Sequence, residues 1–145
     1  MKNSKLAELF AQGYDKGTDS HMFVEGSTIY SYGEHFPIAV RTRMNNEPIA
    51  ILNSRNYSSS TAKHKSYVRS ALSGNWTIIY LAGCQLANIE NQIKNNLEDI
   101  NKHQVKLKRA RVASSISQHE YMIEYLEKQN ILLTQLQNSD IMELV

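Results

Sequence analysis

Tyr-Ser-Ser-Ser-Thr-Ala-Lys-His-Lys-Ser-Tyr-Val-Arg, residues 57–69, is the stretch of sequence from which we predict the fold. Its hydroxyl side chains are typical of a helix N-cap, and they predict a helix over about 61–72 that Gly74 ends. Apolar segments rich in β-favouring residues lie on both sides of it, at 49–52 and 76–81. The sequence therefore predicts an α+β domain in which this helix packs on one face of a sheet.

The segments before this helix predict the rest of the sheet. Residues 27–32 alternate with a period of two over β-favouring types, which indicates a strand. Other strands are predicted at 21–24, 37–43 and 49–52, with a turn at 45–48, a first helix from Ser4 to Gly13 and a loop at 15–20. Together they predict a small antiparallel sheet with one or two packed helices.

Glycine and proline mark the boundary between two predicted parts of the chain. All six glycines and both prolines lie at or before Gly83, so turn signals end where a helical region begins. We therefore predict an α+β head over 1–82 and a helical tail over 83–145.

The tail is predicted to be a long helical element with one apolar stripe. The stripe consists of Leu86, Ile89, Ile93, Leu97 and Ile100. Two arrangements remain open: an antiparallel hairpin that turns at 114–117, or one rod of about 53 residues and roughly 80 Å. A capping-box pattern at Ser117 and Glu120 favours the hairpin. In either arrangement a narrow stripe on so long an element predicts a coiled-coil-like homo-oligomer.

Composition predicts a soluble, cytoplasmic protein. The apolar fraction is 41% and mean hydropathy is −0.46, which suits a modest core with a solvated element attached. The single cysteine, Cys84, excludes an internal disulfide and is predicted to be a packing residue. The first residues carry no signal-peptide pattern, and no segment has the roughly 20 apolar residues of a membrane span.

Basic residues of the head predict a site for an anion. Between His35 and Arg69 the sequence has six basic residues and one acid, Glu47. Tyr30 and Tyr32 share one face of their strand, so tyrosines and arginines are expected on one polar sheet surface. Such a surface suits a nucleic acid or a nucleotide, whereas the alternative is an ordinary N-cap followed by solvated lysines. The predicted ligand-binding residues are Lys63, His64, Lys65 and Arg69, with Arg41 and Arg43 on the neighbouring strand.

A second basic cluster is predicted in the tail. It consists of Lys106, Lys108, Arg109 and Arg111, and no acid occurs between Asp99 and Glu120. In the hairpin arrangement this cluster is at the tip, whereas its alternative role is simply to keep a helix soluble.

No motif in the sequence names a reaction. Only His35 and His64 form a plausible catalytic pair, as acid and base on a phosphodiester. No Asp or Glu has a metal-ligand spacing with either histidine. We therefore predict no catalytic residue, no metal site and no cofactor, with a histidine-dependent phosphodiesterase as the less favoured alternative.

Two phrases resemble a known family. They are Tyr-Ser-Tyr-Gly-Glu-His-Phe-Pro-Ile-Ala at 30–39 and the stretch from Tyr57 to Arg69. They are similar to a small domain of unknown function that recurs in phage, prophage and plasmid proteins. That family's second phrase runs Tyr-Ser-x-Thr-Thr-Ser-Lys-His, and two hydroxyl positions differ here. The resemblance covers about a third of the chain, implies a mobile-element origin and brings no catalytic residue with it.

The predicted function combines these observations. We expect a non-enzymatic phage or mobile-element accessory protein, in the host cytoplasm if phage-encoded. Its basic head binds a phosphate-bearing ligand, either nucleic acid or a signalling nucleotide, and its tail forms a homo-oligomer. The alternative is a counter-defence module whose tail inhibits a host defence protein. No membrane partner is expected.

Overall fold

The computed structural model describes residues 3–19, 21–31, 36–55 and 58–139. The described chain divides into two compact units, one that ends at Leu86 and one over Ala87–Ser139. The first unit contains the α+β fold and the second is helical, which confirms the predicted class. His35, Tyr32 and Tyr57 lie outside the described residues.

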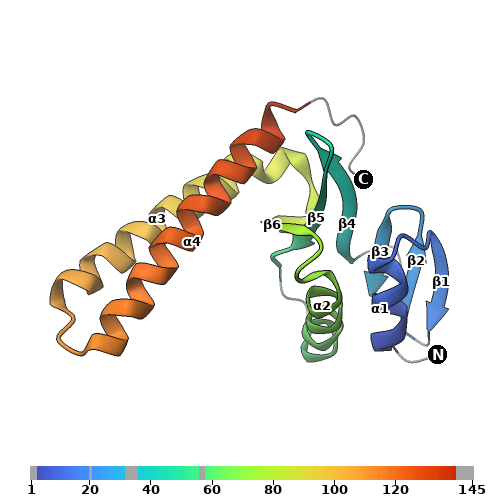
Figure 1. Ribbon diagram of the computed structural model, residues 1–145, viewed down its shortest axis with the longest axis horizontal. Coiled ribbons are helices and arrows are strands. Elements are labelled where there is room, and N and C mark those ends of the chain that lie inside the picture. Colours follow the sequence, from blue (N-terminus) through green and yellow to red (C-terminus); the bar gives the residue numbers. More distant parts are fainter. Residues whose placement is uncertain (1–2, 20, 32–35, 56–57, 140–145) are drawn as a thin grey trace. The chain divides into compact units, whose positions relative to one another are not determined.

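The first unit is built on one six-stranded sheet (Figure 1). Its strands follow the order of the sequence, and each of the first five pairs antiparallel with its neighbour. The strands are β1 (Lys16–Asp19), β2 (Met22–Glu25), β3 (Thr28–Ser31), β4 (Pro37–Met44), β5 (Glu47–Asn53) and β6 (Thr77–Leu81). The β4–β5 hairpin turns at Asn45 and Asn46, whose φ values of 53° and 67° fit a two-residue turn of type I′.

The last two strands, β5 and β6, are parallel, in contrast to the rest of the sheet. Helix α2 (Ser59–Leu72) connects them, because a parallel pair needs a crossover and cannot close through a tight turn. Ser58 caps α2, and its Oγ accepts a hydrogen bond from the Thr61 backbone nitrogen at 3.1 Å. The helix predicted from residues 57–69 is therefore confirmed, and it forms a β–α–β unit within an otherwise antiparallel sheet.

Helices α1 (Asn3–Ala11) and α2 cover one face of this sheet. The core between these helices and the sheet contains Leu6 and Phe10 of α1, Val68 and Leu72 of α2, and strand residues such as Leu52. The other face carries a short 3-10 turn, Ala82–Cys84, whose cysteine Sγ lies 3.4 Å from the Ile51 carbonyl oxygen. Cys84 is therefore a buried packing residue, as the sequence predicts.

One strand contradicts the predicted loop at 15–20. Residues Lys16–Asp19 form β1, an edge strand whose side chains are exposed or half-exposed. Its sequence lacks apolar alternation, so pairing with β2 rather than burial makes it a strand. A Cβ at Gly17 would lie 2.7 Å from Leu6 Cδ1, so a larger residue there would require this methyl group to shift.

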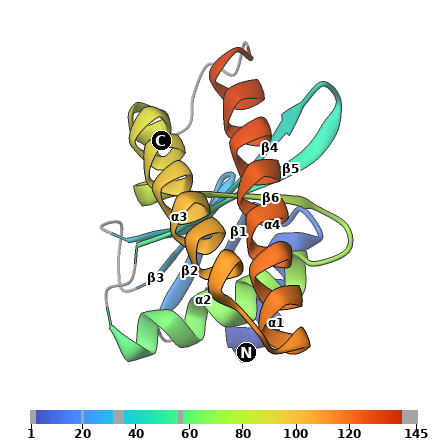
Figure 2. The ribbon, with the colours of Figure 1, turned by 90° about the vertical axis from the view of Figure 1, so that its left-hand side faces the viewer.

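The second unit is a helical hairpin, which settles the choice between the two predicted tail arrangements. Helices α3 (Ile89–Arg109) and α4 (Ala113–Gln137) lie side by side (Figures 1 and 2). Their interface buries Ile100, Leu126 and Leu133 together with amides. Asn96 Nδ2 donates to Asn130 Oδ1 at 2.9 Å, and polar pairs of this kind fix the register of packed helices.

The hairpin turns earlier than predicted. Residues 110–112 separate the helices, with extended backbone at Ala110 and Val112, whereas the predicted turn at 114–117 lies inside α4. The capping box of Ser117 and Glu120 is therefore wrong, and α4 begins without a side-chain cap. Three basic residues in the last turn of α3 favour its end there, because cations stabilise a helix C-terminus. None of the described helices has the length and apolar character needed to cross a membrane.

Candidate functional site

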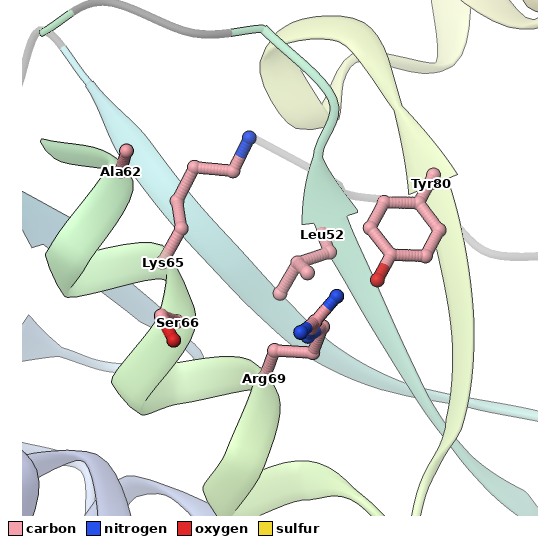
Figure 3. A pocket seen from close by; sticks show the side chains of 6 residues that line it. All are labelled: Leu52, Ala62, Lys65, Ser66, Arg69 and Tyr80. Atoms are coloured by element: carbon pink, nitrogen blue, oxygen red, sulfur yellow. The ribbon is translucent and has the colours of Figure 1, made fainter. Parts of the chain in front are cut away.

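A pocket of about 230 Å³ lies in the first unit, between α2 and strands β5 and β6 (Figure 3). Leu52 and Tyr80 are direct neighbours in the parallel register, so both side chains face α2. From the helix, Lys65 and Arg69 extend over the same pocket. The full lining is Leu52, Ala62, Lys65, Ser66, Arg69 and Tyr80.

The helical repeat explains why α2 presents this group of residues. Positions 62, 65, 66 and 69 form one stripe on a helix, because side chains three and four apart share a face. The adjacent stripe, which includes Val68 and Leu72, is buried against the sheet. Lys65 and Arg69 therefore lie at the border of the buried face, where their stems can rest on apolar surface while their charges stay accessible.

The charge of the pocket is positive. No Asp or Glu occurs between Glu47 and Glu90, so neither α2 nor the two strand ends beside it carry an acid. Lys65 Nζ donates to the Arg55 carbonyl oxygen at 3.1 Å, and burial lowers the pKa of Lys65. Arg69 is exposed, and its guanidinium points toward the Tyr80 hydroxyl in Figure 3. A partly desolvated lysine beside an arginine favours an anion, because a negative ligand stabilises the charged form of each.

The structure separates His64 from this pocket. His64 is buried, with Nδ1 at 2.7 Å from Ser31 Oγ and Nε2 at 3.3 Å from Asn3 Nδ2. Because the Asn3 amide nitrogen can only donate, Nε2 accepts and Nδ1 donates to Ser31. Burial, with the charges of His21 and Lys63, lowers the pKa of His64. The imidazole is thus neutral at neutral pH and connects α2 to β3 and α1.

Lys63 also lies away from the pocket. It is exposed, and at 100° per residue it is on the opposite side of α2 from Lys65. Of the four helix residues predicted to bind ligand, the structure therefore brings Lys65 and Arg69 together and places Lys63 and His64 elsewhere.

The Arg41 side chain makes its contacts within the first unit. Its guanidinium donates to the carbonyl oxygens of Phe10 at 3.0 Å and Gly26 at 2.8 Å, and it lies 4.7 Å above the Phe10 ring centroid. Burial lowers the pKa of Arg41, against the raising effect of Asp15. Arg43 is exposed, and it donates to the Asn46 carbonyl oxygen at 3.2 Å in the β4–β5 turn.

The predicted surface of tyrosines and arginines is wrong for Tyr30. Ile29, which pairs with Ala39 of β4, is in the core beneath the helices, on the face that Arg41 also uses. Strand alternation therefore points Tyr30 to the opposite face, where it stacks on Phe23 with ring centroids 4.8 Å apart.

Sequence reasoning missed four lining residues: Leu52, Ala62, Ser66 and Tyr80. Tyr80 belongs to a predicted strand, but its neighbour across the sheet depends on the parallel register. Ser66 had a usable signal, because it lies three residues before Arg69 and so shares a face with it on a predicted helix.

The second predicted cluster lies at the tip of the helical hairpin. Lys106, Lys108 and Arg109 are in the last turn of α3, and Arg111 is in the turn to α4. We call Lys106, Lys108, Arg109 and Arg111 the tip cluster. Lys106, Lys108 and Arg109 stabilise the C-terminal end of the α3 dipole, so a structural role can explain these charges without a ligand.

Cys84 is not an activated thiol. Burial raises the pKa of the Cys84 thiol to about 12, so it stays protonated and is a poor nucleophile. Within the described ranges, no group of three or more His, Cys, Asp or Glu side chains could hold a metal ion. Comparison with protein families, with curated proteins and with solved structures finds no match for this chain.

Proposed function

We propose that the first unit binds a nucleotide or a similar small phosphate-bearing ligand in the pocket between α2, β5 and β6. The observation that carries this proposal is the convergence of Lys65 and Arg69 on a pocket in an acid-free part of the chain. Arginine and lysine both bind phosphate, arginine through a planar fork and lysine as a point charge.

The apolar part of the lining supports a ligand with a ring as well as a phosphate. Leu52 and the Tyr80 ring form the strand side of the pocket, opposite the two cations. An aromatic ring can stack on a base, and the Tyr80 hydroxyl can hydrogen-bond a ribose or phosphate oxygen. A nucleotide has both an aromatic base and a phosphate.

The size and charge of the surface favour a nucleotide over a nucleic acid. About 230 Å³ is below the roughly 300–1,000 Å³ of common ligand pockets, so the ligand is small or only partly enclosed. Arg41 donates to two backbone carbonyl oxygens, and Arg43, near the end of β4, donates to the Asn46 carbonyl oxygen in the β4–β5 turn. Neither lines the pocket, so the lining does not continue as a basic track for a nucleic-acid strand. On this proposal the protein is a non-enzymatic accessory protein, and the phage or mobile-element origin remains a prediction.

Substitution of the two cations tests the proposal. Arg69→Ala and Lys65→Ala should each weaken the binding of a ribonucleoside monophosphate roughly tenfold to a hundredfold, because a hydrogen bond to a charged group contributes about 1.5–3 kcal/mol. Isothermal titration calorimetry with each of the four monophosphates measures this loss.

Lys63→Ala is the matched control, because it removes the same charge from the same helix on the side away from the pocket. It should leave the affinity within about twofold. Equal losses in all three variants would show that only the net charge matters. Binding of a single-stranded oligonucleotide alone, with a steep decrease in salt, would replace the nucleotide by a nucleic acid.

We also propose that the helical unit forms a dimer with a second copy. Its exposed large apolar side chains include Leu97, Tyr121 and Ile131, each at least 55% exposed. Glu120, Glu124 and Glu127 form an exposed acidic stripe on α4, at spacings of four and three residues. The acidic stripe of one copy is complementary to the basic tip cluster of another, which suits a two-fold symmetric contact.

Light scattering tests this assembly. The unaltered chain should have the mass of a dimer, and Ile131→Lys should shift it toward the mass of a monomer, because the substitution places a charge within an apolar contact. Lys16→Glu, on the edge strand of the first unit, is the control and should leave the mass unchanged. A monomeric unaltered chain that binds one other protein through the hairpin would instead favour the host-protein alternative.

A further inference from the structure

Two histidines meet across the helical hairpin. His103 of α3 and His119 of α4 place their Nδ1 atoms 2.9 Å apart, with ring centroids at 5.2 Å and ring planes tilted by 50°. Both side chains are half-buried. In this arrangement the N–H at one Nδ1 donates a hydrogen bond to the other Nδ1, so each imidazole uses the nitrogen that a metal ion would also bind.

We propose that His103 and His119 form a two-histidine site for Cu²⁺ or Ni²⁺. Neutral imidazole is a preferred ligand of these borderline metals, and either ring nitrogen can coordinate. The proposal is independent of nucleotide binding, because both ligands belong to the helical unit.

The two nitrogens are close enough for one metal ion to bind both. Two nitrogens about 2.0–2.1 Å from one metal ion and at a right angle to each other are about 2.9 Å apart, whereas a tetrahedral angle separates them by about 3.3 Å. The distance of 2.9 Å between His103 and His119 therefore fits neighbouring positions of a tetragonal Cu²⁺ or Ni²⁺ complex. For both Nδ1 atoms to bind the ion, the donor ring must carry its proton on Nε2 instead, and both rings must turn so that their lone pairs face the metal. The second side-chain torsion of histidine is broad enough to allow this.

The surroundings of the pair do not suit Ca²⁺ or Mg²⁺. Lys102 and Lys106 flank His103 on α3, where the nearest acid of that helix, Asp99, lies 3.9 Å from Lys102 Nζ; on α4 the exposed Glu120 follows His119. Ca²⁺ and Mg²⁺ require several oxygen ligands, which this end of the described hairpin does not offer. Water would complete the coordination, and a bound ion would cross-link α3 to α4 and so stabilise the folded hairpin.

Titration of the full chain with NiCl₂ or CuCl₂ at about pH 8 tests the site, because metal binding requires unprotonated imidazole. We expect one ion per chain, a higher midpoint of thermal unfolding, and affinities that rise from Co²⁺ through Ni²⁺ to Cu²⁺. His103→Gln and His119→Gln should each weaken binding roughly tenfold or more, because either change removes the chelate. The double variant should bind the ion at most about threefold more weakly than the weaker of the two single variants.

His21→Gln is the matched control, because it removes an imidazole from the first unit and should leave the titration unchanged. Electron paramagnetic resonance of the Cu²⁺ form should show two coupled nitrogens. Unchanged affinity in both single variants, with folding verified by circular dichroism, would overturn the site. Tighter binding of Zn²⁺ than of Ni²⁺ would overturn the tetragonal geometry.

Discussion

Asn53→Ala should destabilise the first unit by about 2–4 kcal/mol and weaken nucleotide binding. Asn53 is the last residue of β5 and is almost fully buried. Its Oδ1 accepts from the backbone nitrogens of Arg55 and Gly83, both at 2.9 Å, and its Nδ2 donates to the Pro37 carbonyl oxygen at 2.9 Å. Alanine leaves these backbone groups without a partner in a site that water reaches poorly.

The effect on binding follows from the segment that Asn53 holds. The Arg55 carbonyl oxygen accepts the hydrogen bond from Lys65 Nζ, so a loose backbone after β5 also releases one of the two cations of the pocket. We expect a loss of affinity of roughly threefold to tenfold in the folded protein, smaller than for Lys65→Ala because the lysine itself remains.

Urea denaturation and calorimetry measure the two effects of Asn53→Ala separately. Asn53→Asp keeps the acceptor for Arg55 and Gly83, but it sets a buried carboxylate oxygen against the Pro37 carbonyl oxygen, so it too should be less stable than the unaltered chain. Asn91→Ala is the control, because Asn91 is an exposed asparagine on α3. It should change stability by less than about 0.5 kcal/mol. An Asn53→Ala protein as stable as the unaltered chain would show that water replaces the lost partners.

The parts of the fold that sequence predicts well are those with a strong local signal. Helix α2 has a hydroxyl cap, a buried stripe and a following glycine, and β5 and β6 are apolar runs on either side of it. The parallel pairing of β5 and β6 and the strand order are non-local, because they depend on which segments meet in space. Strand β1 has no apolar alternation at all, so only its hydrogen bonds to β2 reveal it.

The candidate site shows the same division. Charge and helical spacing predict Lys65 and Arg69, because both properties are read within one helix. The position of Tyr80 opposite them depends on the register of β6 beside β5, and Leu52 is its neighbour only through that register. The position of the hairpin turn was predicted wrongly for a related reason. Helix α3 ends where the backbone becomes extended at Ala110, and its packing on α4 is a non-local contact.

Arg41 marks the limit of reading charge from sequence. The sequence predicts that Arg41 contacts the ligand. In the structure its guanidinium instead donates to the Phe10 carbonyl oxygen, at the end of α1, and to the Gly26 carbonyl oxygen, in the β2–β3 turn. Its partners, Phe10 and Gly26, lie 31 and 15 residues away in the sequence. No local pattern links these positions, so only the folded chain shows that the charge is used internally.

Arg41→Ala should therefore cost about 2–4 kcal/mol of folding stability and leave nucleotide affinity unchanged. The substitution removes two charge-assisted hydrogen bonds to the Phe10 and Gly26 carbonyl oxygens, and the contact with the Phe10 ring. Arg41→Lys should recover part of the stability only, because an ammonium group lacks the fork that reaches both carbonyls. Urea denaturation measures the first effect, and titration of the folded protein with a monophosphate measures the second.

Arg43→Ala supplies the comparison, because Arg43 is two residues away on β4, has the same charge and is exposed. It should change stability by less than about 0.5 kcal/mol, since its one hydrogen bond joins residues three apart in an exposed turn. If Arg41→Ala instead lowers nucleotide affinity as much as Arg69→Ala does, the ligand contacts the sheet beyond the pocket. The basic surface predicted from sequence would then be restored in place of a pocket confined to α2, β5 and β6.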